Sequence, residues 1–146
     1  VDGMTPATSK REWLFDPSMI TEDDIVDAKG NLIAARGTRV NPLDMVQLSQ
    51  ALVFVDGDNA DQLTWAVKTW SDSAAKIIFV SGSPFDAMKP WQRRFYFDQG
   101  GTLTGKFGIR HTPAVVSAAG SSLKVSEIPL PPAKAAPALS GGGKVS

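Results

Sequence analysis

The sequence contains no cysteine and a single histidine, His111. The absence of cysteine excludes disulfide bonds, thiol catalysis and thiolate metal sites, and a single histidine excludes any site that needs two. Long apolar runs are also missing, because the longest, Ala51 to Val55, is far shorter than the roughly 20 residues that cross a bilayer. The chain starts at Val1 rather than at methionine, so we expect it to derive from a processed precursor.

What is present is typical of a globular domain. Of the 146 residues, 42% are hydrophobic and 21% are charged, which is enough to form a core. The 15 basic and 15 acidic residues cancel, but residues 1–72 hold 12 acids and 6 bases, whereas residues 73–146 hold 3 acids and 9 bases. This division either averages out over the folded surface or produces two faces that prefer different partners.

The N-terminal third predicts an arm that cannot fold alone. Residues 1–12 show no periodicity at their start, and we expect them to be mobile. Within residues 13–50, the apolar pairs Ile25-Val26 and Leu32-Ile33 flank a Gly-Asn turn and predict a small β-hairpin. An isolated hairpin is marginally stable, so this arm must rest on a larger body.

Residues 51–128 form that body. Leu52–Val55 and Ile77–Val80 are continuous apolar runs, which are typical of strands buried on both faces. The order predicts strands alternating with helices in a mostly parallel sheet, with an antiparallel hairpin added at its edge. The other expected elements are a helix with an apolar stripe at Leu63, Ala66, Val67, Trp70 and Ala74, short helices at Phe85–Trp91 and Leu103–Phe107, and strands at Arg94–Asp98, Ala114–Val116 and Leu123–Ile128. Residues 129–146 are rich in proline and glycine, and we expect a disordered tail.

Two segments resemble the active-site region of the thioredoxin fold. Phe107–Val116 resembles its cis-proline segment, with Pro113 as the proline, and Ser81–Phe85 resembles its Cys-Gly-Pro-Cys loop with both cysteines replaced. The resemblance implies a thioredoxin-like α/β fold, in which helices flank a mixed sheet. It also implies that the backbone before Pro113 is exposed to pair with an extended ligand. Redox activity is excluded because the cysteines are absent.

A more specific resemblance extends from about Trp13 to Leu130. The order and spacing of several segments are similar to the TraW family, which comprises pilus assembly proteins of F-type conjugative type IV secretion systems. These segments are Trp13–Ser18, Asp27–Ile33, Gly37–Leu43, Leu52–Asp58, Ser81–Pro84, Tyr96–Gly101 and Phe107–His111. The resemblance implies a role in plasmid transfer, a periplasmic location after removal of a signal peptide, and no enzymatic activity. The partners it implies are TrbC, the companion assembly protein, and other secretion-system components.

The substituted loop and the proline segment predict a protein-binding surface with no cofactor. We expect its residues to be Ser83, Phe85, Arg110, His111 and Pro113, with Trp65 and Trp91 as additional aromatic anchors. Trp65 lies opposite the apolar stripe of its helix, so it is either an exposed anchor within an acidic rim or partly covered by the arm.

Three other classes of site are less well supported by the residues. Ser83 and His111 leave open a hydrolase or a binder of small thiol ligands, but no nucleophile-elbow pattern surrounds the serine, and we predict no catalytic residue. Asp56-Gly57-Asp58 begins like a calcium loop, yet Val67 stands where glutamate is needed, so we predict no metal site. The basic residues Lys89, Arg93, Arg94, Lys106 and Arg110 could contact nucleic acid, but zero net charge favours a solvated or protein-docking face.

Overall fold

The computed structural model describes residues 4–44 and 48–131. Most of the proline- and glycine-rich tail that we expect to be disordered lies outside this range, as do the first three residues of the segment that we expect to be mobile. No helix in the described ranges is long and apolar enough to cross a membrane.

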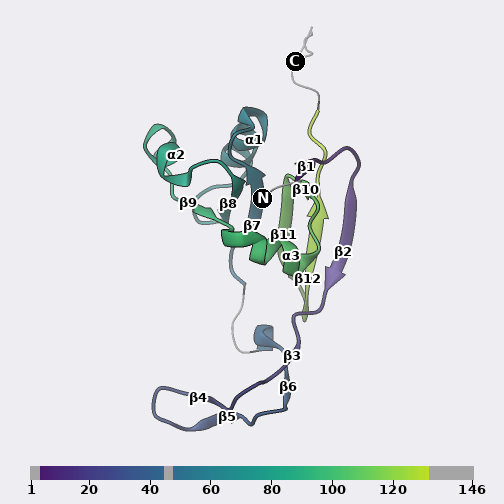
Figure 1. Ribbon diagram of the computed structural model, residues 1–146, viewed down its shortest axis with the longest axis vertical. Helices are drawn as coiled ribbons and strands as arrows, with labels where there is room; N and C mark the ends of the chain where they lie inside the picture. The colour runs from purple at the N-terminus through teal and green to yellow at the C-terminus, as the bar shows by residue number, and fades with distance from the viewer. Residues whose placement is uncertain (1–3, 45–47, 132–146) are drawn as a thin grey trace, which may run out of the picture.

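A six-stranded mixed sheet forms the centre of the molecule, in the order β2-β12-β11-β7-β8-β9 (Figure 1). Its strands are β2 (Arg11–Phe15), β7 (Ala51–Asp56), β8 (Ala75–Ser81), β9 (Phe95–Phe97), β11 (Ala114–Ala119) and β12 (Ser122–Glu127). Only β7, β8 and β9 are parallel, whereas β11 pairs antiparallel with both β7 and β12. The sheet is therefore not mostly parallel. The C-terminal hairpin lies inside it rather than at its edge, since β2 covers β12.

Helices cover both faces of the sheet, and this explains the continuous apolar runs. Val53 and Val55 of β7 belong to a first core beneath α1 (Ala60–Thr69) and α2 (Pro84–Trp91). Phe54 points the other way into a second core with Phe107 of α3 (Thr102–Phe107), which follows the 3-10 turn η2 (Gln99–Gly101). All three β7 side chains are fully buried, as the sequence predicts.

The helix α1 begins after the N-cap residue Asn59. The Asn59 side chain accepts hydrogen bonds from the backbone N–H groups of Asp61 and Gln62, satisfying donors that have no partner within the helix. The helix ends at Thr69, so the last two positions of the expected stripe, Trp70 and Ala74, lie beyond it.

Strand β2 places residues from the N-terminal part of the chain beside residues from its C-terminal part. The sequence predicts an arm over residues 13–50, but β2 pairs antiparallel with β12 and forms the outer edge of the central sheet. The indole Nε1 of Trp13 also donates a hydrogen bond of 3.0 Å to the carbonyl of Phe107. Trp13 and Phe15 are partly buried and pack against the second core.

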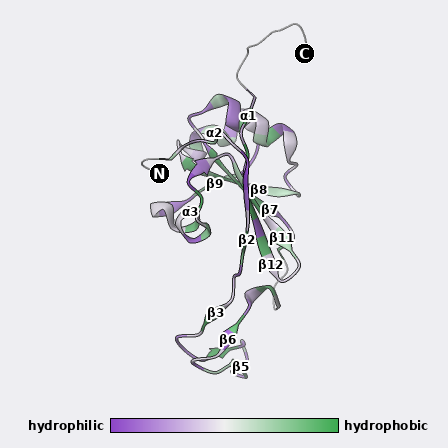
Figure 2. Cartoon of the chain, turned by 90° about the vertical axis from the view of Figure 1, so that its right-hand side faces the viewer, coloured by the Kyte–Doolittle hydropathy of each residue, from purple (hydrophilic) through white to green (hydrophobic). Residues whose placement is uncertain are grey.

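The rest of the arm projects below the sheet as two short antiparallel ladders (Figures 1 and 2). One pairs β4 (Ile25–Val26) with β5 (Leu32–Ala34), which confirms the predicted hairpin. The other pairs β3 (Met19–Ile20) with β6 (Arg39–Val40), ahead of the 3-10 turn η1 (Pro42–Asp44). The arm exposes several apolar side chains, namely Met19, Ile20, Val26, Leu32 and Ile33.

Candidate functional site

The most distinctive backbone feature is a cis peptide bond between Thr112 and Pro113, which confirms the prediction of a cis-proline. It connects β10 (His111–Thr112) to β11, and both residues are buried. Because Ala114 pairs with Phe54 in the antiparallel ladder, this loop lies next to the carboxyl end of β7. The elements that face it are therefore the loop after β7 and the first turn of α1.

A buried glutamine connects these elements. Gln62, which is 2% exposed, donates from its Nε2 to the carbonyl of Thr112 at 3.2 Å. Its Oε1 accepts the backbone N–H of Asp56 at 2.9 Å. One side chain thus satisfies polar groups of two loops at once, and it fixes α1 against the cis-proline.

The loop that we expected beside the proline lies one strand further away. Ser81–Phe85 follows β8, which neighbours β7 and not β11. The Ser81 hydroxyl donates to Asp56 at 2.7 Å, and the Ser83 hydroxyl accepts the Asp86 N–H at 3.2 Å as the N-cap of α2. The sequence contains two successive strand–turn–helix units, and only the strand order reveals which of them faces Pro113.

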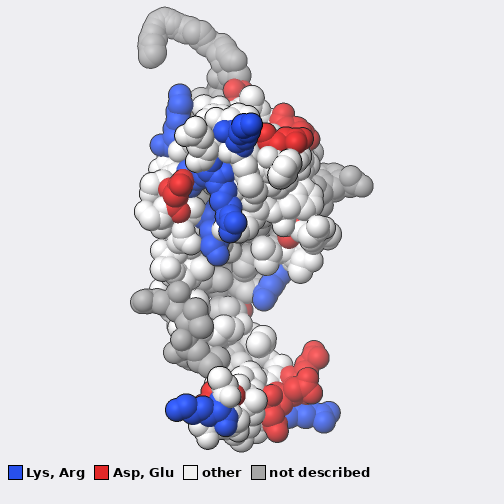
Figure 3. Space-filling view, turned by 90° about the vertical axis from the view of Figure 1, so that its left-hand side faces the viewer, with Lys and Arg blue, Asp and Glu red and all other residues white. Residues whose placement is uncertain are grey.

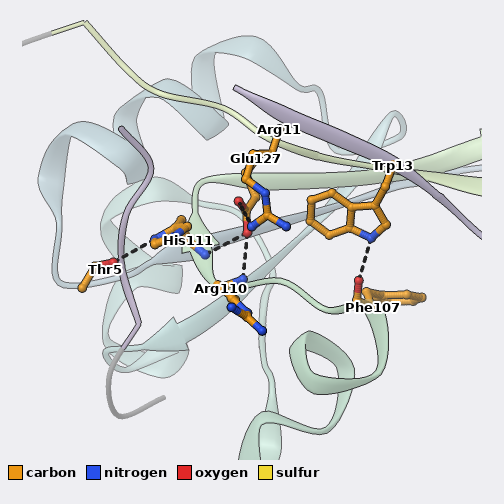
Figure 4. Close-up of polar contacts among 7 residues, drawn as sticks. All are labelled: Thr5, Arg11, Trp13, Phe107, Arg110, His111 and Glu127. Carbon is orange, nitrogen blue, oxygen red and sulfur yellow. Dashed lines mark hydrogen bonds and ion pairs between the residues drawn. The ribbon is translucent and has the colours of Figure 1, made fainter. Parts of the chain in front are cut away.

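Glu127 holds the loop before the proline in place, although the sequence analysis did not single it out (Figure 4). The side chain is fully buried. Its Oε2 accepts the backbone N–H groups of Arg110 and His111 at 2.8 and 3.0 Å, and its Oε1 pairs with the Arg11 guanidinium at 2.9 Å. A signal exists in the sequence, because Glu127 continues the inward alternation of Leu123 and Val125 along β12.

The backbone edge beside the proline is not free for a ligand, contrary to our expectation. The N-terminal strand β1 (Thr5–Pro6), in a segment that we expected to be mobile, pairs in parallel with β10. The Ala7 N–H donates to the carbonyl of Thr112 at 2.8 Å. The Thr5 hydroxyl lies 2.8 Å from Nδ1 of His111 (Figure 4). The chain therefore covers its own cis-proline loop.

A small cavity of about 160 Å³ remains under this cover. Such a volume holds a few side-chain atoms or water molecules, whereas cofactor sites are typically about 300–1,000 Å³. Its walls come from β1, α1, the cis-proline loop and the chain after β12. The lining residues are Pro6, Ala7, Asn59, Asp61, Gln62, Thr112, Pro113, Leu130 and Pro131.

The predicted site residues fall into two groups. Arg110, His111 and Pro113 lie together at the cis-proline loop, where Arg110 is exposed, His111 is half-buried and Pro113 is buried. Ser83 is the N-cap of α2, and Phe85 lies in its first turn with its side chain 82% exposed. Among the described residues, no hydrogen bond joins Ser83 to His111.

The two tryptophans are not exposed anchors. Trp65 and Trp91 are both half-buried and pack against the first core. The first core therefore covers part of the Trp65 ring. Trp91 is the last residue of α2.

The acidic turn after β7 has a structural role. Asp56 accepts hydrogen bonds from the Ser81 hydroxyl and from the Asp58 N–H. In the described part of the chain, no three side chains of the metal-binding types gather into a ligand set.

The expected basic group divides into exposed and buried members. Lysine and arginine side chains gather on the face that carries α2 and β9 (Figure 3). Lys76 and Arg94 flank a shallow hollow there with Tyr96. Arg93 is only 8% exposed and binds backbone carbonyls, so it is not part of a docking surface.

These features define a mixed α/β domain built around a cis-proline loop that its own N-terminal strand covers. No protein-family model matches the chain, and no solved structure matches it. The chain is 41% identical over 119 residues to Protein TraW of Escherichia coli (strain K12). The alignment covers 80% of this chain and 57% of that protein, so the chain spans little more than half of its relative's length. The matched region belongs to the TraW family.

Proposed function

We propose that this region is a thioredoxin-like domain that acts without redox chemistry. The support is the cis-proline at the start of β11, placed against the first turn of a helix, in a sheet flanked by helices. The chain has no cysteine, so it cannot exchange disulfides.

We further propose that the domain is a non-catalytic assembly factor of an F-type conjugative pilus, located in the periplasm. The similarity to Protein TraW supports this role. The observation that carries the non-catalytic part is how the polar groups of the site are used. Ser83 caps α2, His111 contacts Thr5, and Glu127 binds backbone N–H groups. These contacts hold the fold together and leave a surface for protein binding.

The proposed partners are a TrbC-like assembly protein and other components of the secretion system, without direct contact to nucleic acid. Ser83, Phe85 and Arg110 are the exposed members of the predicted site, and the two with large side chains, Phe85 and Arg110, are the proposed docking residues. A large exposed aromatic ring and an arginine are the side chains that most often dominate the energy of protein interfaces. Ser83, His111, Pro113, Trp65 and Trp91 then support the surface from beneath or beside it.

Co-purification from periplasm with a tagged TrbC-like partner tests this proposal. We expect the wild-type domain to be captured, and Phe85→Ala and Arg110→Ala to weaken capture at least ten-fold. The matched controls Tyr96→Ala and Lys124→Ala also remove one exposed aromatic ring and one exposed cation, and they should be captured like the wild type. Failure to capture the wild type would overturn the assembly role, and unchanged capture of both variants would overturn the docking surface.

An esterase assay tests the catalytic alternative. We expect no ester turnover above that of buffer. Turnover by the wild type that disappears in both Ser83→Ala and His111→Ala would replace the assembly role by a hydrolase.

A further inference from the structure

Exposed apolar side chains are concentrated at two opposite ends of the molecule. In the described ranges nine large apolar side chains are exposed, and eight of them lie either on the arm or on α2 and β9. Figure 1 shows the arm below the sheet and α2 beside its upper part, so the two groups cannot meet within one copy of the chain. Each is therefore open to another molecule. The arm carries Met19, Ile20, Val26, Leu32 and Ile33, and the other end carries Phe85, Tyr96 and Phe97.

The arm keeps its shape through polar contacts of its own. The hydroxyl of the buried Thr21 donates to the carbonyl of Ala35 at 2.8 Å, and the Asp24 carboxylate accepts the N–H of Arg36 at 2.8 Å. Within the described residues, neither hydrophobic core includes a side chain from residues 19–40. Ladders this short are marginal in water unless another surface packs on them. The arm thus presents apolar side chains that its own domain does not cover.

The arm is acidic where it is apolar. Residues 16–43 hold five acids and three bases. Three consecutive acids, residues 22–24, are exposed and line a hollow of about 400 Å³ together with Met19 and Ile20. Two arms that met at this hollow would bring like charges together.

The surface formed by α2, β9 and the neighbouring Lys76, which we call the α2–β9 face, has the opposite charge. Lysine and arginine side chains gather on it (Figure 3). Its exposed cations are Lys76, Lys89 and Arg94. Asp86 is an exposed acid of α2, and Asp72 is held in an ion pair with a buried arginine. Two such faces that met would oppose their cations.

The α2–β9 face also has room for apolar side chains. A hollow of about 600 Å³ lies against α2, and its lining includes Phe85, Met88 and Pro90. Pockets of roughly 300–1,000 Å³ hold whole small molecules, so this hollow can accept leucine or isoleucine side chains. The face therefore complements the arm both in charge and in apolar character.

We propose that the arm of one copy docks on the α2–β9 face of a second copy, with residues 22–24 opposite Lys89 and Arg94 and the apolar side chains of the arm against the hollow of α2. Because the two surfaces differ, each copy can offer one arm and receive another. The inference goes beyond the proposed function, and its test contains no other protein. Phe85 belongs to both docking surfaces, so a bound partner and a second copy exclude each other there.

Sedimentation equilibrium of the purified chain tests the contact. We expect the average mass to rise above the 15.5 kDa of one chain as the protein concentration approaches about 1 mM. The variants Glu22→Lys/Asp23→Lys and Lys89→Glu/Arg94→Glu should each weaken self-association at least ten-fold, because each brings like charges into contact. The control Lys106→Glu/Lys124→Glu reverses two exposed lysines outside both surfaces and changes the net charge by as much, and it should associate like the wild type.

An equimolar mixture of the two charge-reversed variants tests which surfaces meet. It should recover the association of the wild type, because the reversed arm of one variant meets the reversed face of the other, and the native arm meets the native face. A wild type that stays monomeric at about 1 mM, a loss in only one of the two variants, or a mixture without recovery would each overturn the proposal.

A pair of leucines tests the apolar part of the contact and keeps the proposal testable should a charge-reversed variant fail to fold. Leu32 on the arm and Leu14 on β2 are 60% and 68% exposed. Leu32→Ser should weaken self-association at least ten-fold, because the leucine becomes buried in the contact, whereas Leu14→Ser should leave it unchanged. Equal effects of the two substitutions would overturn the proposal.

Discussion

Arg11 and Glu127 form an ion pair of 2.9 Å between residues that lie 116 positions apart in the chain. They are directly opposite each other on β2 and β12, so the pair connects the outer edge of the sheet to the strand that holds the cis-proline loop. The Arg11 side chain is 46% exposed, whereas Glu127 is fully buried. The carboxylate is therefore the partner on which the local structure depends.

Glu127→Gln should lower the free energy of unfolding by about 2 kcal/mol. The glutamine amide is neutral, and its NH2 group cannot accept a hydrogen bond. Both carboxylate oxygens of Glu127 do accept, one from Arg11 and the other from the N–H groups of Arg110 and His111. Urea unfolding followed by tryptophan fluorescence measures the change. Glu12→Gln, at a more exposed acid on the neighbouring strand, is the control and should leave the urea midpoint unchanged. A wild-type midpoint for Glu127→Gln would contradict the role of this carboxylate.

Gly57→Ala should destabilise the domain by about 1–3 kcal/mol, because it overpacks a filled position. A Cβ atom at Gly57 would lie 2.4 Å from Cδ2 of Phe79 and 2.7 Å from the carbonyl of Ser81. At Gly105 in α3, by contrast, nothing lies within 4 Å of such an atom. Gly105→Ala should raise stability by about 0.5–1 kcal/mol, because alanine favours the helix. Thermal unfolding of both variants checks the opposite signs, and two shifts in the same direction would refute the packing argument.

Arg93→Met should cost about 3 kcal/mol of stability, whereas Arg94→Met should stay within about 0.5 kcal/mol. Arg93 is buried, donates to the carbonyls of Trp70, Ser71 and Ala75, and pairs with Asp72 at 3.0 Å. Arg94 is exposed. Chemical denaturation of the two variants separates a buried structural cation from a surface cation. Equal losses would show that burial does not distinguish them.

The turn of the arm should lose its order in acid at a pH below the ordinary aspartate range. Hydrogen bonds from the Asn31 backbone and side chain, together with the Lys29 N–H, lower the pKa of Asp27 below its usual 3.8. Because the folded turn favours the carboxylate, this stabilisation is complete above pH 4 and disappears as the pH falls through the lowered pKa. Amide shifts of Lys29 and Asn31 should titrate with a midpoint below 3.8, and the transition should be absent in Asp27→Asn. A midpoint above 3.8 would contradict the sign.

Local patterns predicted most elements of the fold, because their causes lie within a few residues. The apolar runs around Val53 and Ile78 became central strands, and Asn59 caps the helix that follows the first of them. The hairpin around Gly30 also formed as its turn residues predict. In each case a short segment carries both the periodicity and the residue that ends it.

The pairing of strands that lie far apart in the sequence was not predicted. Nothing near Trp13 indicates that β2 joins β12, and nothing near Ser83 indicates that β8 lies one strand away from β11. The site was therefore predicted only in part: Pro113 and its neighbours were found, but the wrong helix was placed beside them. Glu127 was missed because one acidic residue at the end of a strand usually faces solvent.

The pairing of β2 with β12 has a consequence for the order in which the domain can fold. During synthesis, β2 emerges before β12 and has no pairing partner until Glu127, the last residue of β12, has also emerged. The two strands of this ladder come from opposite ends of the domain. Contacts of such wide sequence separation form late and slowly. The outer edge of the sheet therefore closes only after the last strand has been synthesised.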